Sequence, residues 1–192
     1  MKNKILNIGL TLVIAFSTLA FTTLNEEKKE IKVANSKVTW KGYKVTGSHY
    51  GSIALKSGHF MFDGDKLTGG EFIIDMTTIS SEDLSGKAKA NFDGHMKSED
   101  FFNVANNPTS SLVITKVKSN GKNAYKVTGN LTIKGKTEKI AFDLSIYGSK
   151  ATGALKIDRT KFGLRYGSGS FFDNLGDKTI YDEFDLVVDL EF

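Results

Sequence analysis

The sequence predicts an all-β fold with one helical insertion, in which eight antiparallel strands form an up-and-down barrel. Three observations predict it. From residue 31 onward, apolar side chains recur at every second position, the period of a strand with one apolar and one polar face. Turn signals rich in Gly, Asn and Asp separate neighbouring strands. A single stretch interrupts them with helical spacing. A two-sheet sandwich is the alternative architecture.

The strands before the helical stretch follow this pattern. In KVTWKGYKV, the apolar residues Val38 and Trp40 lie on one face. The segment GHFMFDGDKLTGGEFIIDMTTI reads as two strands, with DGD and TGG as its turn elements. In the second of these strands, Phe72, Ile74 and Met76 share a face.

The helical stretch covers residues 80–103, SSEDLSGKAKANFDGHMKSEDFFN. Ser81 is a candidate N-cap and acidic residues follow it directly. The apolar residues at helical spacing are Leu84, Ala88 and Phe92. A shorter turn from Ser98 delivers Phe101 and Phe102, before NNP ends it. We therefore expect one helix, placed so that it can cover one end of the barrel.

The clearest strands lie between residues 111 and 158, with turns predicted in SNGKN, IKGKTEK and YGSK. Their apolar faces contain Tyr125, Val127, Leu131, Ile133, Ile140, Phe142, Leu144, Ile146, Ala151, Leu155 and Ile157. The chain ends in FDLVVDLEF, where every second residue from Phe184 to Phe192 is apolar and Asp185, Asp189 and Glu191 lie between them. This apolar face points either outward into a membrane or inward around an apolar interior.

Composition and the N-terminal segment limit the function classes. The chain has 192 residues, enough for one domain with a real core, and no cysteine, which excludes disulfides and cysteine metal sites. Residues 1–24 resemble a signal peptide, and residues 25–192 then form the mature domain. An uncleaved anchor is the alternative. Removing Lys2 and Lys4 lowers the formal charge from +4 to +2, and the scattered basic residues give no support for nucleic-acid binding.

Three features favour an inward apolar face over an outer-membrane barrel. The helical insertion is long for a small membrane barrel. The polar faces are rich in Lys and Thr, as in KVTGNLTIK, which suits solvent. The strands also lack the pairs of aromatic residues expected where each strand crosses the two membrane interfaces. A small outer-membrane barrel remains the alternative function class.

The order of five motifs resembles that of the YceI-like family: VTWKGYKVTGSHYGSI, GGEFIIDMTTIS, GHMKSEDFFNVANNPTS, VTGNLTIKGKTEKIAF and IDRTKFGLRYG. The resemblance covers about residues 33–192. It implies an exported bacterial protein whose lipocalin-like barrel holds a polyisoprenoid chain in an apolar tunnel. The ligand it implies is an isoprenoid quinone or a polyprenyl lipid. HMKS departs slightly from the family pattern, in which Leu often follows the His.

The alternation and the resemblance together predict the tunnel lining, with an ordinary filled core as the alternative. The predicted ligand-binding residues are Val38, Trp40, Phe72, Ile74, Met76, Phe92, Phe101, Phe102, Leu131, Ile133, Phe142, Leu144, Leu155, Ile157, Leu186 and Val188. The head-group candidates are His49, His95 and Arg159. Structural hydrogen bonds for both histidines and a salt-bridged corner at Asp158-Arg159-Thr160 are the alternatives.

Other sites receive no support from the sequence. The spacing of the three histidines enforces no metal site. GSGS, residues 167–170, lacks the Lys-Ser/Thr ending of a phosphate loop and reads as a flexible rim loop beside Phe171 and Phe172. No nucleophile–base or paired-carboxylate arrangement can be assembled, so we expect no enzyme activity. A quinone-linked enzyme would need His49, His95 or Arg159 for turnover.

We therefore expect a periplasmic or secreted protein that carries or stores a polyisoprenoid lipid without chemistry. No cofactor is expected beyond the bound lipid. The expected partners are the hydrophobic lipid and, transiently, the membrane with which it is exchanged. A homodimer is compatible with the sequence.

Overall fold

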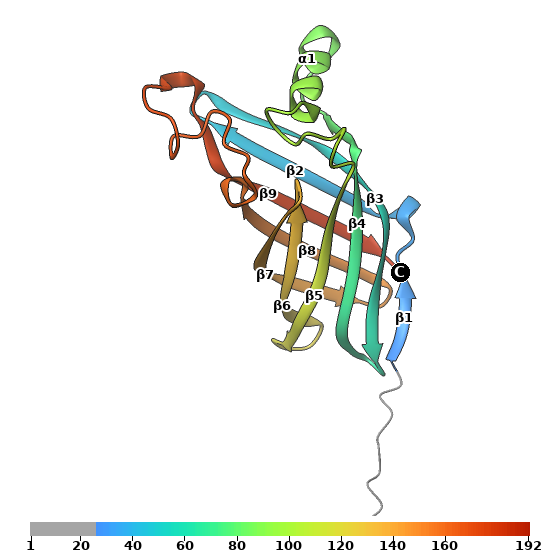
Figure 1. Ribbon diagram of the computed structural model, residues 1–192. Helices are drawn as coiled ribbons and strands as arrows, with labels where there is room; N and C mark the ends of the chain where they lie inside the picture. Colours follow the sequence, from blue (N-terminus) through green and yellow to red (C-terminus); the bar gives the residue numbers. More distant parts are fainter. Residues whose placement is uncertain (1–25) are drawn as a thin grey trace, which may run out of the picture.

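Among the residues that the structure describes, eight antiparallel strands close into a barrel, with one helix and an extra edge strand (Figure 1). The computed structural model describes residues 26–192. Strand β9 pairs with β2 and β4 pairs with β3, so the sheet closes on itself and the predicted barrel is confirmed over the sandwich. The elements are β1 (Glu26–Glu30), β2 (Lys37–Lys44), β3 (Gly47–Asp63), β4 (Lys66–Ser81), α1 (Gly86–Lys97), β5 (Thr109–Ser119), β6 (Ala124–Ile133), β7 (Lys136–Tyr147), β8 (Lys150–Asp158) and β9 (Ile180–Glu191), with 3₁₀ turns at Val33–Asn35, Arg159–Phe162 and Gly176–Lys178.

The extra strand β1 has no counterpart in the predicted set. Its sequence, EEKKE, has no apolar alternation, and it forms a strand because its backbone pairs with the free edge of β3, from Glu26 opposite Asp63 to Glu30 opposite His59. The predicted signal peptide, residues 1–24, lies outside the residues that the structure describes.

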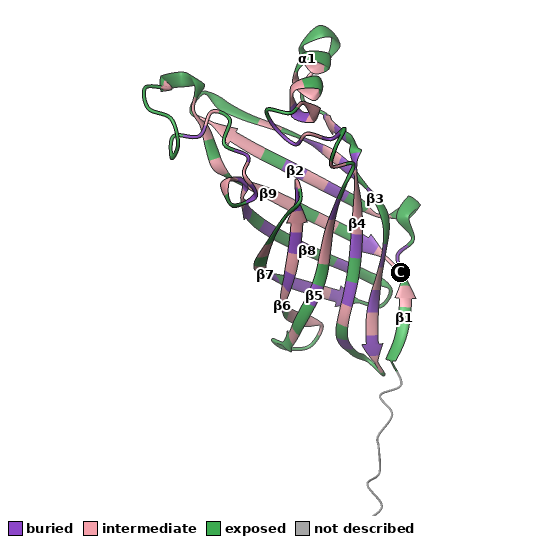
Figure 2. Ribbon diagram, viewed as in Figure 1, coloured by how far each residue is buried: buried purple, intermediate pink, exposed green. Residues whose placement is uncertain are grey.

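The apolar faces of the strands point inward. Strand β8 shows the alternation most cleanly, because Ala151, Leu155 and Ile157 are buried while Lys150 and Lys156 are exposed. Figure 2 shows the same alternation of buried and exposed positions along the barrel strands. On β9, Phe184, Leu186, Val188 and Leu190 face the interior. An outer-membrane barrel is not favoured, because its outward positions must be apolar.

Register shifts change which residues face inward. The β3–β4 register shifts between Ser52 and Ala54, between Leu55 and Ser57, and between Met61 and Phe62. One residue added to a strand turns the following side chains of that strand to the opposite face. The second shift adds one residue to β3, so inward positions on β3 are odd-numbered up to Leu55 and even-numbered at Phe60 and Phe62.

The predicted DGD turn joins β3 to β4, but TGG is not a turn. Gly69 and Gly70 lie within β4. A Cβ on Gly70 would stand 2.6 Å from the carbonyl oxygen of His59 on β3. Glycine is needed here for the close approach of two backbones, not for a reversal of the chain.

Helix α1 begins later than the sequence predicts. Ser81 is the last residue of β4 and is 1% exposed, whereas the N-cap is Ser85. The pairing of Ser81 with Gly51 on β3 keeps residue 81 in the sheet. The predicted turn after Ser98 is present, and it buries Phe101 and Phe102. Among residues 26–192, no helix has the length and apolar character to cross a membrane.

Candidate functional site

The barrel encloses a cavity of about 480 Å³, within the range of small-molecule sites. Side chains from all eight barrel strands, from α1 and from the turn that follows it line the cavity. The surface that these residues present to the cavity is almost wholly apolar, although several charged residues are among them. The interior is therefore not a filled core but a lined space inside the barrel.

All but one of the apolar residues predicted as ligand-binding line this cavity. They are Val38, Trp40, Phe72, Ile74, Met76, Phe92, Phe101, Phe102, Leu131, Ile133, Phe142, Leu144, Leu155, Leu186 and Val188. The exception is Ile157, which is 2% exposed and does not line the cavity. It lies at the end of β8 and belongs to the same buried cluster as Phe162 and Leu164, from the segment that follows β8.

The cavity also has lining residues that the sequence analysis missed. They include Ile53, Leu55, Phe60, Ile79, Met96, Leu112, Ile114, Tyr166, Ile180, Phe184 and Leu190. The two-residue period was a usable signal for Ile53 with Leu55, and for Phe184 with Leu190. No such signal marks Phe60 or Ile79. A β3–β4 register shift precedes each of them and changes whether odd-numbered or even-numbered residues of the strand face inward.

The β3–β4 turn lies at the end of the barrel opposite α1 (Figure 1). Four phenylalanine rings pack together near this turn. The ring of Phe60 lies 5.0 Å from Phe72, 5.3 Å from Phe192 and 6.2 Å from Phe62. Phe62 and Phe192 are 5.6 Å apart. Phe60 and Phe72 line the cavity, so this cluster is its floor.

Helix α1 covers the opposite end through Phe92. Its ring stacks on Trp40 at 6.1 Å between centroids and lies 4.7 Å from the ring of His49. The indole Nε1 of Trp40 donates to the carbonyl oxygen of Ser52, at 3.2 Å, which fixes the indole. The aromatic contact between α1 and the strands therefore depends on a tryptophan whose orientation is set within the barrel.

Asp93 ties α1 to the end of β4. Its carboxylate accepts hydrogen bonds of 2.8 Å from the Ser81 N–H and from the Ser80 hydroxyl, and it pairs with Lys89 at 3.1 Å. Burial by itself would raise the pKa of Asp93, but the hydrogen bonds from Ser81, Ser80 and Lys89 outweigh it and lower this pKa to about 2. The carboxylate is thus ionised and committed to holding the helix.

His49 is engaged in a structural contact. Its Nδ1 lies 2.7 Å from Asp83 Oδ2, and Asp83 Oδ1 accepts from the Tyr50 N–H at 3.2 Å. Burial opposes ionisation of Asp83, but hydrogen bonds from His49 and the Tyr50 N–H lower its pKa overall. The pair joins the start of β3 to the segment before α1.

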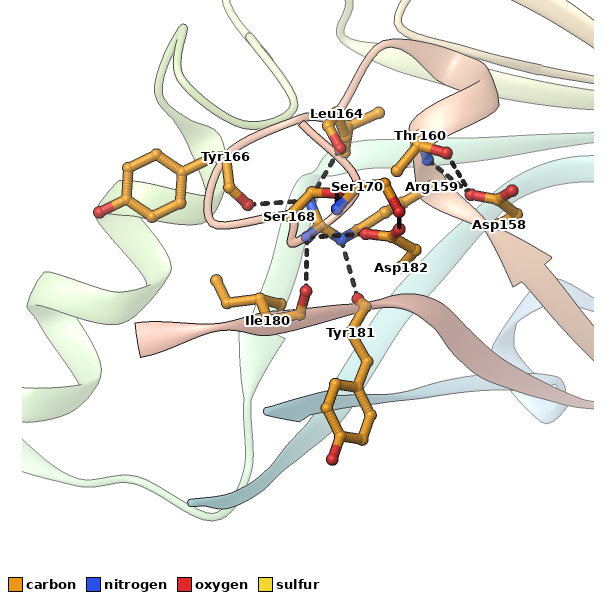
Figure 3. A network of polar contacts seen from close by, with 10 residues as sticks. All are labelled: Asp158, Arg159, Thr160, Leu164, Tyr166, Ser168, Ser170, Ile180, Tyr181 and Asp182. Carbon is orange, nitrogen blue, oxygen red and sulfur yellow. Dashed lines mark hydrogen bonds and ion pairs between the residues drawn. The ribbon is translucent and has the colours of Figure 1, made fainter. Parts of the chain in front are cut away.

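Arg159 lies at the centre of a network of backbone contacts (Figure 3). Its Nε donates to Tyr181 O, its Nη1 to Leu164 O and Tyr166 O, and its Nη2 to Ile180 O, at 2.7–3.0 Å. Burial lowers the pKa of this guanidinium. Four of its five N–H groups therefore donate to backbone carbonyls, and these hydrogen bonds hold Arg159 in place at the cavity.

The corner at Arg159 differs in its partners from the predicted salt bridge. The carboxylate facing Arg159 is Asp182, with Oδ1 3.6 Å from Nη2, and not Asp158. Asp158 instead accepts from the Thr160 N–H at 3.0 Å and from its hydroxyl at 2.5 Å. Only the fold brings Asp182 to this corner, because it comes from β9.

The segment Gly167–Ser170 is not the free loop that its composition suggests. Ser168 is fully buried and bridges to Ile180, whose N–H donates to the carbonyl oxygen of Gly167 at 2.8 Å. Beside it, Phe171 and Phe172 are 45% and 51% exposed. The segment anchors the rim, while its neighbouring aromatic rings face solvent.

Two residues that line the cavity each have a buried side-chain polar atom with no hydrogen-bond partner among residues 26–192. These atoms are His95 Nε2 and Ser110 Oγ. The ring of His95 lies 4.4 Å from that of Tyr166 and 5.7 Å from that of Phe101. A buried polar group without a partner costs about 1–3 kcal/mol. Within the same residues, no cluster of His, Asp and Glu could hold a metal ion.

The chain belongs to the family of proteins with a YceI-like domain, whose model matches residues 29–192. It is 29% identical to a UPF0312 protein of Azotobacter vinelandii over 143 residues, which cover 74% of this chain and 71% of that protein. A UPF0312 protein of Pseudomonas aeruginosa is 34% identical over 99 residues, 52% of this chain and 49% of the relative.

Solved structures share the barrel. Burkholderia cenocepacia BcnA is 25% identical, with a TM-score of 0.65 over 83% of this chain and 98% of that one. A polyisoprenoid-binding domain from Saccharophagus degradans, implicated in plant cell wall breakdown, is 11% identical, with a TM-score of 0.57 over 88% of this chain and 97% of the domain. At this identity the second comparison establishes the fold alone.

Proposed function

We propose that this protein binds a polyisoprenoid lipid, either an isoprenoid quinone or a polyprenyl lipid, inside its barrel and carries or stores it unchanged. The observation that carries the proposal is the almost wholly apolar cavity of about 480 Å³. The YceI-like family and the polyisoprenoid-binding domain of similar fold support the same ligand class.

The physical basis is the burial of a long apolar chain. Each buried methylene gains about 0.8 kcal/mol, so a prenyl chain binds through its area and needs few polar contacts. Between the floor at Phe60 and the cover at Phe92, the apolar lining residues would contact the chain. The fixed floor would limit the length of chain that the barrel accepts.

We also propose that the protein is exported and that the lipid enters and leaves at a membrane. The signal-peptide pattern of residues 1–24 supports export. Around the opening, an aromatic rim of Tyr50, Tyr166, Phe171, Phe172 and Tyr181 is 45–52% exposed. Aromatic side chains are favoured at the interface between membrane and water. Two rim residues, Tyr166 and Tyr181, also line the cavity, so the rim is continuous with the proposed lipid site.

The proposal is tested by expressing residues 25–192 in a bacterium, purifying them without detergent, and combining native mass spectrometry with lipid extraction. We expect a bound mass in the range of a prenyl lipid and the same lipid in the extract. An empty protein that also fails to take up added prenyl lipids would refute lipid binding. Separately, the N-terminal residue of the full chain recovered from the periplasm tests export and cleavage.

A further inference from the structure

The interior of the barrel has a hollow part and a filled part. Because neighbouring strands are antiparallel, the β3–β4, β5–β6 and β7–β8 turns lie at one end of the barrel, opposite α1 (Figure 1). Apolar side chains from this end pack in the core but do not line the cavity: Phe62, Leu67, Val127, Ile146, Ala151 and Phe192. The cavity therefore ends within the barrel, against a packed layer of side chains.

Phe72 lies at the boundary between the two parts. It lines the cavity and is 6% exposed. Its ring fills space that two glycines leave free: Cδ1 lies 2.6 Å from where a Cβ on Gly58 would stand, and Cε2 lies 3.3 Å from where a Cβ on Gly70 would stand. The ring of Phe60 is 5.0 Å from it. Phe72 is thus held at the closed end by β3, by its own strand and by a second ring.

Ile114 of β5 meets Phe72 at this closed end. It also lines the cavity, and its Cδ1 lies 3.4 Å from the same Cβ position on Gly70. Both side chains therefore cover the one glycine, which offers no side chain of its own. A smaller residue in place of Phe72 would deepen the cavity here, and a larger one in place of Ile114 would make it shallower.

A closed end limits how much of a linear ligand can be buried. Each added isoprene unit gains free energy only while the cavity has room to remove it from water. We propose that Phe72 and Ile114 determine how many isoprene units the cavity accepts, so that the protein selects its lipid by chain length. This inference rests on the proposed function and names the residues that make its site specific.

The test measures affinity for a series of all-trans prenols that differ by one isoprene unit. The protein is purified from cells that express the full chain and is then stripped of lipid. Trp40 is the single tryptophan and lines the cavity, so its fluorescence reports occupancy. The variants are Phe72→Ala and Ile114→Phe. The control is Phe102→Ala, the same truncation at a cavity-lining ring in the turn that follows α1.

For the native protein, we expect each added unit to raise the affinity at least tenfold up to a limiting length, and less than twofold beyond it. Phe72→Ala should raise the limit by one unit, because a phenyl ring has about as many carbon atoms as an isoprene unit. Ile114→Phe should lower the limit by one unit. Phe102→Ala should weaken binding of all lengths by a similar factor and leave the limit unchanged.

Thermal melting of the lipid-free variants identifies those that fold, and the two variants shift the limit in opposite directions, so either one tests the inference. An affinity of the native protein that rises with every added unit would show that the cavity is not closed at this end. A limit that stays the same in the folded variants, or that moves equally in Phe102→Ala, would show that Phe72 and Ile114 do not set it. These results overturn the inference and leave lipid binding intact. If no prenol of any length binds the native protein, the proposed function fails, and this inference fails with it.

Discussion

The two ends of the barrel are closed by different kinds of interaction. At the floor, four phenylalanine rings pack against one another with 5.0–6.2 Å between the contacting pairs. At the opening, the Asp93 network holds α1, and Arg159 joins the segment that follows β8 to the start of β9. Apolar packing seals the floor without specific partners, whereas the opening depends on a few polar groups whose loss can be tested one at a time.

The largest effect is expected at the floor. Phe60 is 1% exposed and touches three other rings, so Phe60→Ala should lower the free energy of unfolding by about 3–5 kcal/mol. Urea denaturation followed by circular dichroism measures this. Phe171→Ala, at an exposed ring of the rim, is the matched control and should change stability by less than about 0.5 kcal/mol. Equal effects at both positions would contradict the distinction between the two ends.

A smaller effect on stability is expected where β3 approaches Trp40, the residue on which Phe92 of α1 stacks. A Cβ on Gly51 would stand 1.9 Å from Ser80 O and 2.7 Å from Cζ2 of Trp40. Gly51→Ala should therefore displace both neighbours and destabilise the protein by about 2–3 kcal/mol, with a change in Trp40 fluorescence. Gly42→Ala is the control, because a Cβ there meets no atom within 4 Å. An unchanged emission spectrum for Gly51→Ala would show that Trp40 does not depend on this contact.

The anchor of α1 makes the opening sensitive to acid. Asp93 has a pKa of about 2 against an ordinary value of 3.8, so its stabilising contribution is present above pH 3.8 and is lost as the pH falls toward 2. Asp93→Asn should cost roughly 2 kcal/mol at pH 7 by this linkage. The difference from the native protein should shrink between pH 4 and about 2, measured by urea denaturation at each pH. A constant difference over this range would contradict a charged anchor.

The smallest effect on stability, but a clear one on exchange, is expected at the aromatic rim. The double change Phe171→Ser and Phe172→Ser removes two half-exposed rings. Stability should change by less than about 0.5 kcal/mol. The rate of prenyl-lipid transfer from phosphatidylethanolamine–phosphatidylglycerol vesicles should fall about tenfold. The free energy equivalent to this change is a fraction of the free energy gained by burying two aromatic rings. An unchanged transfer rate would exclude these rings from the membrane contact.

Much of the fold and of the cavity could be predicted from the sequence. The alternation in β6, β8 and β9 indicates their inward residues directly, because a strand turns its side chains to opposite faces in strict succession. The positions of Phe101 and Phe102 also followed from the turn at Ser98. Such local patterns depend only on neighbours in the chain.

Other features depend on contacts between distant segments. EEKKE forms a strand because β3 offers it an edge, and Ser81 stays in the sheet because it pairs with Gly51. The bulges between β3 and β4 determine that Phe60 faces inward. The role of Arg159 depends on carbonyl oxygens of residues 164–181, which only the closed barrel brings around it.

The sequence by itself determined that the chain forms successive strands with one apolar and one polar face, because periodicity and turn chemistry are local properties of the chain. Only the tertiary structure decided that the sheet closes with its apolar face inward, that the interior contains a cavity, and that buried polar atoms of His95 and Ser110 have no partner among residues 26–192. The reason is that a cavity and an unpaired atom are defined by what lies around them in three dimensions. That surrounding is set by register, bulges and closure, which no single segment specifies.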